Sequence, residues 1–293
     1  MISEYDRGLA YGDGLFETIA SIHGQLHNWT LHWQRLIDGA KQLQLDVPDE
    51  NTVLARIKTH KDYSNHNCVI KLIVTRGEGG RGYQFPQKQK CRLYVSIHRW
   101  PERALKDYYS GIDVCICHTC LAQQPALAGI KHLNRLEQVL ARNEINDEQF
   151  QEGLVLACEC VANRPFNATQ QSASLVIEAT SSNLFFVKEG QLLTPKIDTC
   201  GVNGTIRQQI INLSMELGID IQQIPVCLHD LYEASEIFLT NSIFGIVPIR
   251  SITFDTQTHW HFAGQQEKTG LLATQLAQHI NRAIERPETL LCV

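Results

Sequence analysis

AGIKHLNRLEQVLAR, residues 128–142, is the stretch of this sequence that says most about its fold and its chemistry. Small and apolar residues at 127–130 predict a strand-like approach, and Lys131 follows directly. Apolar residues then recur at helical spacing: Leu133, Leu136, Val139 and Leu140. Lys131 is therefore predicted at a strand-to-helix junction. A lysine so placed can form a Schiff base with an aldehyde cofactor, and the alternative is a solvated lysine at a helix start.

The composition bounds the class of protein. The chain has 293 residues, of which 43% are hydrophobic and 19% are charged, so two domains with a sizeable core are possible. The net charge of −5 indicates neither a nucleic-acid partner nor an anionic membrane. The sequence has no apolar run long enough to cross a membrane. The start, MISEYDRGLAYGDG, lacks a basic region followed by an apolar core, so a cytoplasmic location is expected.

Cysteine spacing does not predict a metal site. The ten cysteines include Cys115, Cys117 and Cys120 in DVCICHTC, and the pair Cys158 and Cys160. Structural zinc sites usually combine one CxxC pair with a second such pair, and the second pair is absent here. The spacing instead fits a β-strand that buries Cys115 and Cys117 on one face. We expect no metal, and reduced thiols in the core.

Strands and helices are predicted to alternate along the chain. The predicted strands are 15–22, 68–75, 91–97, 112–119, 153–157, 175–179, 184–188 and a final one at 236–240. Thr30 is predicted to cap a helix whose apolar face is Trp33, Leu36, Ala40 and Leu43, and further helices are predicted from about Thr205 and over 269–284. This order predicts a mixed α/β fold of two domains. A smaller α/β domain covers 1–99, a polar linker 100–111, and a larger cofactor domain 112–293, with the cofactor in the cleft between them.

A glycine-rich loop follows the predicted strand 68–75. RGEGGRGY, residues 76–83, matches a dinucleotide motif, but Pro86 and the absence of apolar periodicity argue against the helix that such a motif must open. A loop between strands is the better interpretation. Arg76 and Arg81 on this loop could hold a substrate carboxylate, or could be solvated loop residues.

Three further features indicate a phosphorylated pyridine aldehyde as the cofactor. Glu178 ends an apolar strand in VIEATSSNLFFVK, and a protonated pyridine nitrogen is a suitable partner for such a carboxylate; capping a turn is the alternative. In GVNGTIRQQI, a tight turn precedes a helix whose first N–H groups and Thr205 hydroxyl can bind a phosphate, although a plain helix cap is also possible. Arg35, early in the helix after Thr30, is a further phosphate partner or merely a surface arginine.

These motifs, taken in order, resemble the fold-type IV pyridoxal-phosphate enzymes, the family of D-amino-acid and branched-chain aminotransferases and aminodeoxychorismate lyases. The matching segments are DRGLAYGDGLFETI (6–19), HWQRL with Arg35, IKHLNRLEQ with Lys131, IEATSSNLF with Glu178, GVNGTIRQ with Thr205 and Ile206, and EIFLTNSIFGIVP (236–248) with Asn241 and Ser242. The resemblance covers nearly the whole chain. It implies pyridoxal 5′-phosphate as cofactor, bound by Lys131, Glu178, Arg35, Thr205, Ile206, Asn241 and Ser242.

Within the family, RGEGGRGY and the Lys131 segment resemble the lyases more than the transaminases. This resemblance implies conversion of 4-amino-4-deoxychorismate to 4-aminobenzoate and pyruvate, with Lys131 as the base and Thr18 assisting proton transfer to the leaving group. It also implies a homodimer acting on a small-molecule substrate. Transamination of D- or branched-chain amino acids is the alternative activity.

Overall fold

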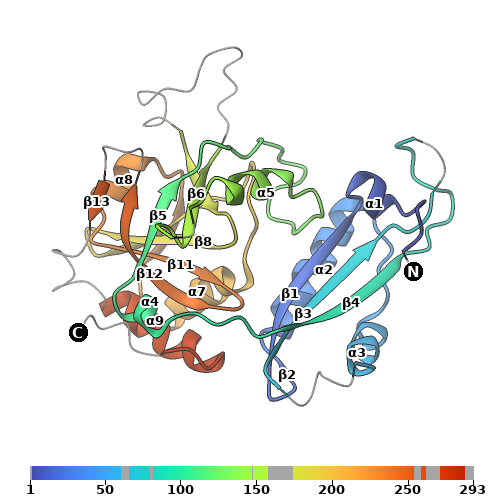
Figure 1. The fold of residues 1–293 in the computed structure, drawn as a ribbon, viewed down its shortest axis with the longest axis horizontal. Coiled ribbons are helices and arrows are strands. Elements are labelled where there is room, and N and C mark those ends of the chain that lie inside the picture. The colour runs from blue at the N-terminus through green and yellow to red at the C-terminus, as the bar shows by residue number, and fades with distance from the viewer. Residues whose placement is uncertain are drawn as a thin grey trace, which may run out of the picture. The chain divides into compact units, whose positions relative to one another are not determined.

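The computed structural model describes residues 2–60, 66–79, 82–146, 148–157, 174–253, 259–261 and 271–287 (Figure 1). The chain forms two compact units, and the mixed α/β class predicted from the sequence is confirmed. The first unit comprises Met1–Glu102 together with Ile130–Arg135, and the second comprises Arg103–Gly129 and Leu136–Val293. The Lys131 segment therefore belongs to the first unit, although the sequence placed it in the larger domain. The cause is backbone pairing, because the Phe16 N–H donates to the Lys131 carbonyl at 2.9 Å.

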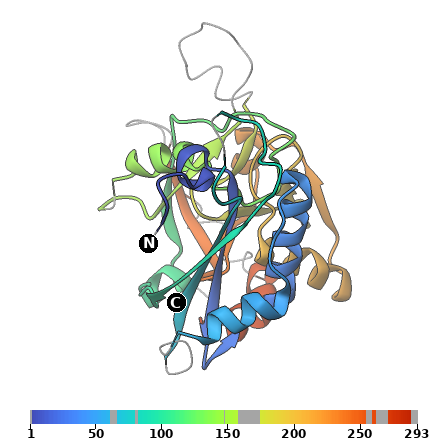
Figure 2. The same ribbon diagram turned by 90° about the vertical axis from the view of Figure 1, so that its right-hand side faces the viewer.

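The first unit is a four-stranded antiparallel sheet with helices. Its elements are α1 (Arg7–Tyr11), β1 (Gly14–Ile22), β2 (Gln25–Leu26), α2 (Trp29–Leu43), α3 (Glu50–Lys58), β3 (Cys68–Thr75) and β4 (Arg92–Arg99). The strand order is β2-β1-β3-β4, and α2 lies along β1 (Figure 2). The predicted strand at 68–75 coincides with β3. Helix α2 begins one residue before Thr30, with Asn28 at its N-cap instead.

Strand alternation gives this first sheet two different faces. Ile19 of β1 and Ile70 of β3 are fully buried and pack with Val53 and Ile57 of α3. The opposite face carries Phe16, Thr18 and Lys71, none of which is fully buried. The helices thus cover the apolar face, and the other face presents polar and aromatic side chains.

The second unit is built on a nine-stranded mixed sheet. Its elements are α4 (Leu105–Tyr109), β5 (Ile112–Ile116), α5 (Leu136–Asn143), β6 (Glu152–Leu156), β7 (Val176–Ala179), β8 (Asn183–Lys188), β9 (Gln191–Pro195), α7 (Thr205–Glu216), β10 (Ile221–Ile224), α8 (Leu228–Tyr232), β11 (Glu236–Asn241), β12 (Gly245–Thr253), β13 (His259–His261) and α9 (Leu271–Ala283). The order is β10-β9-β8-β11-β12-β5-β6-β7, with β13 beside β12. A short turn joins β7, at one end of this order, to β8 in its other half, so the sheet curls.

The core of the second unit lies between this sheet and helices α7 and α9. The Phe185 and Phe238 rings stack across β8 and β11 with centroids 5.3 Å apart, and both side chains are fully buried. Helix α7 packs against β11, helix α9 against β12, and the two helices against each other. These contacts fix the β7–β8 turn and the start of α7, which carry the residues discussed below.

Three sequence-based expectations need correction in the second unit. The predicted linker 100–111 contains helix α4, whose buried Tyr108 donates a hydrogen bond to the Phe244 carbonyl at 3.1 Å. The strand at 236–241 is not the last one, because β12 and β13 follow it. The predicted apolar face of α5 is exposed, since the exposed fractions of Leu136, Val139 and Leu140 are 76%, 59% and 58%.

The cysteines, the metal-ligating side chains and the helix lengths are further features of the described residues. The cysteines within the described ranges are free thiols, with Cys117 buried and Cys115 half-buried, while Cys158 and Cys160 lie outside those ranges. The described part of the chain has no group of three metal-ligating side chains. Among the helices that the structure describes, none has both the length and the apolar character needed to span a membrane.

Candidate active site

Lys131 lies beside β1 in the first unit. Its carbonyl accepts from Phe16, and the neighbouring Leu133 N–H donates to the Gly14 carbonyl at 3.0 Å, so the segment is held as an extra extended stretch. The Lys131 Nζ lies 4.4 Å from the centre of the Phe16 ring. The Phe16 ring is half-buried. Its contact with the Lys131 amine restricts the directions in which this amine can point. Helix α5 begins only at Leu136, so Lys131 precedes the helix by a short loop.

A second lysine lies over the same ring. The Lys71 Nζ is 5.4 Å from the Phe16 centroid, and Lys71 is paired in register with Thr18 across β1 and β3. Sequence reasoning missed Lys71. The available signal was a charged residue at the centre of the apolar strand CVIKLIVT, where alternation places it on the less buried face. Two ammonium groups and the Thr18 strand position therefore share one face of the first sheet.

His132 adds no positive charge to this face near neutral pH. Burial, with the nearby Arg135 and Lys131 charges, lowers the pKa of His132 to about 4. Its Nδ1 is buried and has no hydrogen-bond partner. The imidazole is therefore neutral beside Lys131 at physiological pH.

Arg35, predicted to bind the cofactor phosphate, is bonded to Glu17 of β1. Its Nε donates to Glu17 Oε1 at 2.8 Å, and its NH2 group donates to Oε2 at 2.5 Å. His32 Nδ1 lies 2.6 Å from the same carboxylate, and Glu17 and His32 are each 1% exposed. Burial alone would raise the pKa of Glu17, but Arg35 and His32 outweigh it and lower the pKa to about 2. Sequence reasoning missed the bonds of Glu17 to His32 and Arg35, because Glu17 lies on β1 and its two partners lie on α2.

Glu178 is buried at the end of β7 in the second unit, with 4% of its surface exposed. The Val202 N–H donates to its Oε2 at 2.9 Å. Val202 belongs to the turn Gly201–Gly204, which precedes α7, so the carboxylate and this turn are joined directly. Gly201 has a positive φ, and a Cβ added to it would lie 2.6 Å from Ile177 Cγ2, so both observations favour glycine there.

The turn Gly201–Gly204 ends at the first residues of α7, Thr205 and Ile206. Asn183 Nδ2 donates to the Val202 carbonyl at 2.8 Å. A Cβ on Gly204 would lie 1.9 Å from Asn183 Oδ1, so only glycine fits at the N-cap. The first N–H groups of a helix have no intrahelical acceptor, and they favour an anion together with the helix dipole. The start of α7 therefore has the form of the predicted phosphate site.

The same turn is bonded to Gly129, which lies just before the Lys131 segment. The Gly129 N–H donates to the Gly201 carbonyl at 3.0 Å, and the Asn203 N–H donates to the Gly129 carbonyl at 3.0 Å. Lys131 follows Gly129 by two residues. The predicted strand-like approach at 127–130 is thus reduced to this isolated bridge.

Asn241 and Ser242 lie at the end of β11. Asn241 Oδ1 accepts from the Ile243 and Phe244 N–H groups at 2.9 and 2.8 Å, and its Nδ2 donates to Ser182 Oγ at 3.1 Å. Ser182 belongs to the β7–β8 turn that follows Glu178. The second unit therefore brings together the turns at 180–182, 201–204 and 241–244.

Glu152 anchors the β7–β8 turn from beneath. It is buried, and its carboxylate accepts from the Thr180 hydroxyl, from Ser181 Oγ at 2.6 Å and from Ser182 Oγ at 3.3 Å. Sequence reasoning missed Glu152. The only local signal was a carboxylate at the start of an apolar strand. Glu152 fixes the run of hydroxyl residues after Glu178.

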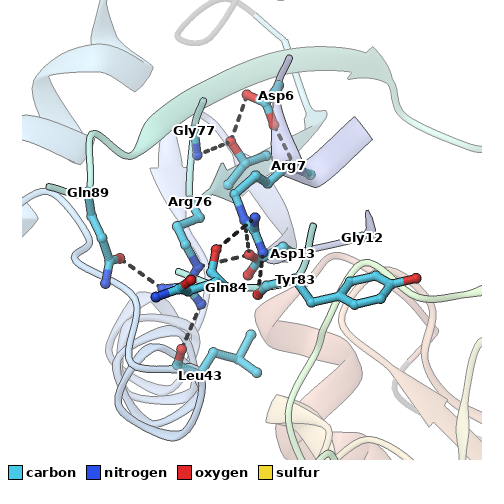
Figure 3. A network of polar contacts seen from close by, with 12 residues as sticks. Asp6, Arg7, Gly12, Asp13, Leu43, Arg76, Gly77, Tyr83, Gln84 and Gln89 are labelled. Carbon is cyan, nitrogen blue, oxygen red and sulfur yellow. Dashed lines mark hydrogen bonds and ion pairs between the residues drawn. The ribbon is translucent and has the colours of Figure 1, made fainter. Parts of the chain in front are cut away.

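Arg76 was predicted to bind a substrate carboxylate, but the structure places it in a network of protein contacts (Figure 3). Its side chain is 1% exposed, its Nε donates to Asp13 Oδ2 at 2.8 Å, and its NH1 and NH2 groups donate to the Gln44 and Leu43 carbonyls, both at 2.7 Å. Gln89 accepts a further bond from NH1 at 2.9 Å. These contacts occupy four of the five N–H groups, so this conformation does not offer Arg76 to a substrate. Arg81 lies outside the described residues.

Asp13 also binds Arg7, whose Nε donates to Asp13 Oδ2 at 2.8 Å. Arg7 further donates to the carbonyls of Gly82, Tyr83 and Gln84 at 3.0, 3.1 and 3.3 Å. The Asp13 carboxylate thus joins Arg7 of the opening motif to Arg76 of the glycine-rich loop (Figure 3). Burial raises the pKa of Asp13, but the two guanidinium groups outweigh it and hold this pKa below its usual value.

Comparison with known proteins identifies the family. The amino-transferase class IV family matches residues 14–252. An aminodeoxychorismate lyase from Vibrio harveyi is 35% identical over 250 residues, covering 85% of this chain and 86% of the relative. A crystal structure of 4-amino-4-deoxychorismate lyase from Pseudomonas aeruginosa has a TM-score of 0.81 and 35% identity, covering 96% of this chain and 95% of that one. A D-alanine aminotransferase from Listeria monocytogenes is 26% identical, covering 96% of this chain and 90% of the relative.

The chain therefore belongs to the class IV aminotransferase family, the fold-type IV enzymes that use pyridoxal phosphate. The second unit fits that cofactor on its own geometry. The start of α7 presents N–H groups to an anion, and Gly204 leaves no room for a side chain. Glu178 is a buried carboxylate, and such a group suits a cationic ring nitrogen.

Proposed function

We propose that this enzyme is a pyridoxal-phosphate-dependent lyase that converts 4-amino-4-deoxychorismate to 4-aminobenzoate and pyruvate. The observation that carries the proposal is the sequence identity of 35% to two aminodeoxychorismate lyases. One is the Vibrio harveyi relative, over 85% of this chain, and the other is the Pseudomonas aeruginosa crystal structure, over 96%. Lys71 over the Phe16 ring supports the proposal, because an ammonium group suits a substrate that carries carboxylates.

The proposal gives individual residues defined tasks. Lys131 would hold the cofactor, and its amine, when free, would take the proton from the amine-bearing carbon of the substrate. Pyridoxal phosphate, when bound, supplies the electron sink that side chains lack. Glu178 holds the protonated ring nitrogen, and Thr205 and Ile206 at the start of α7 hold the phosphate. Asn241 and Ser242 shape the neighbouring turn.

Residues of the first unit complete the proposed machinery. Arg35, oriented by its two bonds to Glu17, is the predicted phosphate cation. Thr18 assists proton transfer to the leaving enolpyruvyl oxygen, and Lys71, its cross-strand neighbour, attracts a substrate carboxylate. Arg81 stays a predicted substrate ligand.

The activity test uses the purified enzyme with 4-amino-4-deoxychorismate and no keto-acid acceptor. A lyase regenerates its cofactor in every cycle, so we expect many turnovers with equal amounts of 4-aminobenzoate and pyruvate. If no 4-aminobenzoate forms, while D-alanine or a branched-chain amino acid turns over with 2-oxoglutarate, the alternative is correct. The likeness to the D-alanine aminotransferase is what keeps transamination as the second candidate.

The cofactor attachment has its own test. The purified protein should absorb visible light, and borohydride reduction should abolish this absorption and leave a pyridoxyl label on Lys131. Peptide mapping that finds the label on Lys71 or on another lysine would refute the assignment independently of which substrate is used.

The proposal also includes a homodimer and a cytoplasmic location. Leu136, Val139 and Leu140 form an exposed apolar row on α5, which a second subunit could cover. We expect a dimer in sedimentation at micromolar concentration. A monomer with full activity would contradict this part of the proposal and leave the lyase assignment intact.

A further inference from the structure

Arg207, the third residue of α7, is a buried cation with an unusual set of partners. Its side chain is 2% exposed. The NH1 group donates to Asn203 Oδ1 at 2.8 Å, and the NH2 group donates to the Pro195 carbonyl at 3.0 Å and to Gln223 Oε1 at 2.8 Å. All three acceptors are neutral, and the buried Nε has no hydrogen-bond partner. A buried guanidinium with only neutral acceptors needs a negative charge nearby.

Glu178 provides that charge. Burial lowers the pKa of Arg207 to about 10, and the attraction of the Glu178 carboxylate opposes this shift. Arg207 therefore remains a cation at neutral pH. The attraction between the two groups is electrostatic.

Two hydrogen bonds through the turn Gly201–Gly204 also connect the two residues. Arg207 holds the Asn203 side chain, and Asn203 lies in the turn Gly201–Gly204. One residue earlier in that turn, the Val202 N–H donates to Glu178 at 2.9 Å. Moving the Asn203 side chain would thus move the N–H group that orients the Glu178 carboxylate. Asn183 also donates a hydrogen bond to the Val202 carbonyl. Side chains of Asn183 and Arg207 therefore both hold the turn in place.

We propose that Arg207 is a positioning residue for Glu178, acting through the turn Gly201–Gly204 and through its buried positive charge. The inference rests on the proposed role of Glu178 as partner of the cofactor ring nitrogen. Arg207 would then share the Glu178 carboxylate with the protonated ring, and set where that carboxylate lies. A purely structural role, tying α7 to β9 and β10 through Pro195 and Gln223, is the competing explanation.

The test compares two cofactors that differ at one atom. Apoenzyme is titrated with pyridoxal phosphate and with 1-deazapyridoxal phosphate, in which a C–H group replaces the ring nitrogen. If Arg207 acts through Glu178, Arg207→Gln should weaken binding of pyridoxal phosphate about tenfold, or about 1.4 kcal/mol. The same substitution should change binding of the deaza analogue by less than about threefold. Equal losses for both cofactors would overturn the proposal.

Further variants keep the test valid if Arg207→Gln does not fold. Asn203→Ala cuts the bond between Arg207 and the turn but leaves the charge in place, and it should also weaken pyridoxal phosphate more than its analogue. Arg207→Lys, which retains the charge, should restore part of the loss. Gln223→Ala is the matched control, because it removes a partner of Arg207 outside the turn, and it should affect both cofactors alike. A selective loss in Gln223→Ala, or none in Asn203→Ala, would count against the proposal.

The readout separates this inference from the proposed function. It needs only cofactor binding, so it stands whether the enzyme is a lyase or a transaminase. If the wild-type enzyme does not prefer pyridoxal phosphate to the deaza analogue, the role of Glu178 is wrong. If the wild type shows the preference and the Arg207 and Asn203 variants retain it, only the inference about Arg207 fails.

Discussion

Arg76 in the first unit and Arg207 in the second are both buried arginines, 1% and 2% exposed, but they are neutralised in different ways. Arg76 bonds directly to the Asp13 carboxylate at 2.8 Å, and its remaining contacts include two main-chain carbonyls (Figure 3). Arg207 donates to three neutral oxygens, and the Glu178 carboxylate attracts it electrostatically. The first cation has a carboxylate as a direct hydrogen-bond partner, whereas the hydrogen-bond acceptors of the second are neutral.

This difference indicates how to distinguish a structural arginine from a functional one. Arg76 lies on a glycine-rich loop, a place where substrate ligands are common, and yet its contacts are those of a folded core. Arg207 lies within the regular helix α7, and its sequence context did not predict a role for it. It is nevertheless linked to Glu178, the predicted partner of the cofactor. Partners, rather than the type of element, therefore decide the role of a buried charge.

Removing the carboxylate of the first network should have the largest effect. Asp13→Asn leaves Arg7 and Arg76 buried without their shared counter-charge, so we expect the free energy of unfolding to fall by about 3–5 kcal/mol. Urea denaturation followed by circular dichroism measures this. Asp38→Asn, on the exposed side of α2, is the control and should cost under about 0.5 kcal/mol. A loss in Asp13→Asn as small as the control would show that Arg76 is not anchored by Asp13.

The second effect is the pH dependence of the first unit. Glu17 has its pKa lowered from 4.5 to about 2, so its ionisation stabilises the folded state above pH 4.5, and this contribution is lost as the pH falls from 4.5 to 2. The shift corresponds to roughly 3 kcal/mol. Asp13, with its lowered pKa, changes in the same direction. The neutral acceptors of Arg207 do not titrate in this range.

Equilibrium denaturation across this pH window measures the Glu17 contribution. Glu17→Gln should be less stable at pH 6 and should show a flatter pH dependence than the wild type between pH 4.5 and 2. An unchanged pH profile in Glu17→Gln would show that other carboxylates cause the acid sensitivity.

Strand composition was the most reliable signal in the sequence. The β3 strand at 68–75 was predicted at its true ends, and β1 to within one residue, because both segments are rich in apolar and β-branched residues. The β12 strand was missed because it begins at Gly245 and contains Pro248, and both residues argue against a strand. Its register with β11 and β5 supplies the missing information, and that pairing is not local.

The candidate site could be predicted only in part for the same reason. Local motifs located Lys131, Glu178 and the start of α7 along the chain. Hydrogen-bond partners such as Glu17 for Arg35, or Asp13 for Arg76, are set by tertiary packing. The sequence therefore identified side chains suited to the chemistry, but could not show which of them were already bonded.

A milder change tests whether Arg76 has any role in substrate binding. Arg76→Lys retains the charge but cannot make all the bonds of the planar guanidinium, so we expect a loss of about 1–3 kcal/mol in the free energy of unfolding. KM for 4-amino-4-deoxychorismate, measured where the variant is fully folded, should change less than about twofold. Lys71→Ala is the comparison variant, and it should raise KM. A larger rise in KM for Arg76→Lys than for Lys71→Ala would restore the original prediction that Arg76 binds substrate.

The smallest expected effect concerns Phe85, whose ring lies 3.9 Å from the Arg76 guanidinium carbon. Phe85 is 46% exposed, so this cation–π contact should contribute only about 0.5–1 kcal/mol. Phe85→Leu keeps most of the apolar surface and removes the aromatic face, and the free energy of unfolding should fall by that amount. Tyr83→Leu is the control, since the Tyr83 ring packs against Tyr11 instead. The Phe85 loss should shrink in an Asp13→Asn background if Arg76 leaves its position when its carboxylate is removed. A loss of the same size in both backgrounds would mean that Asp13 neutralises Arg76 without positioning it.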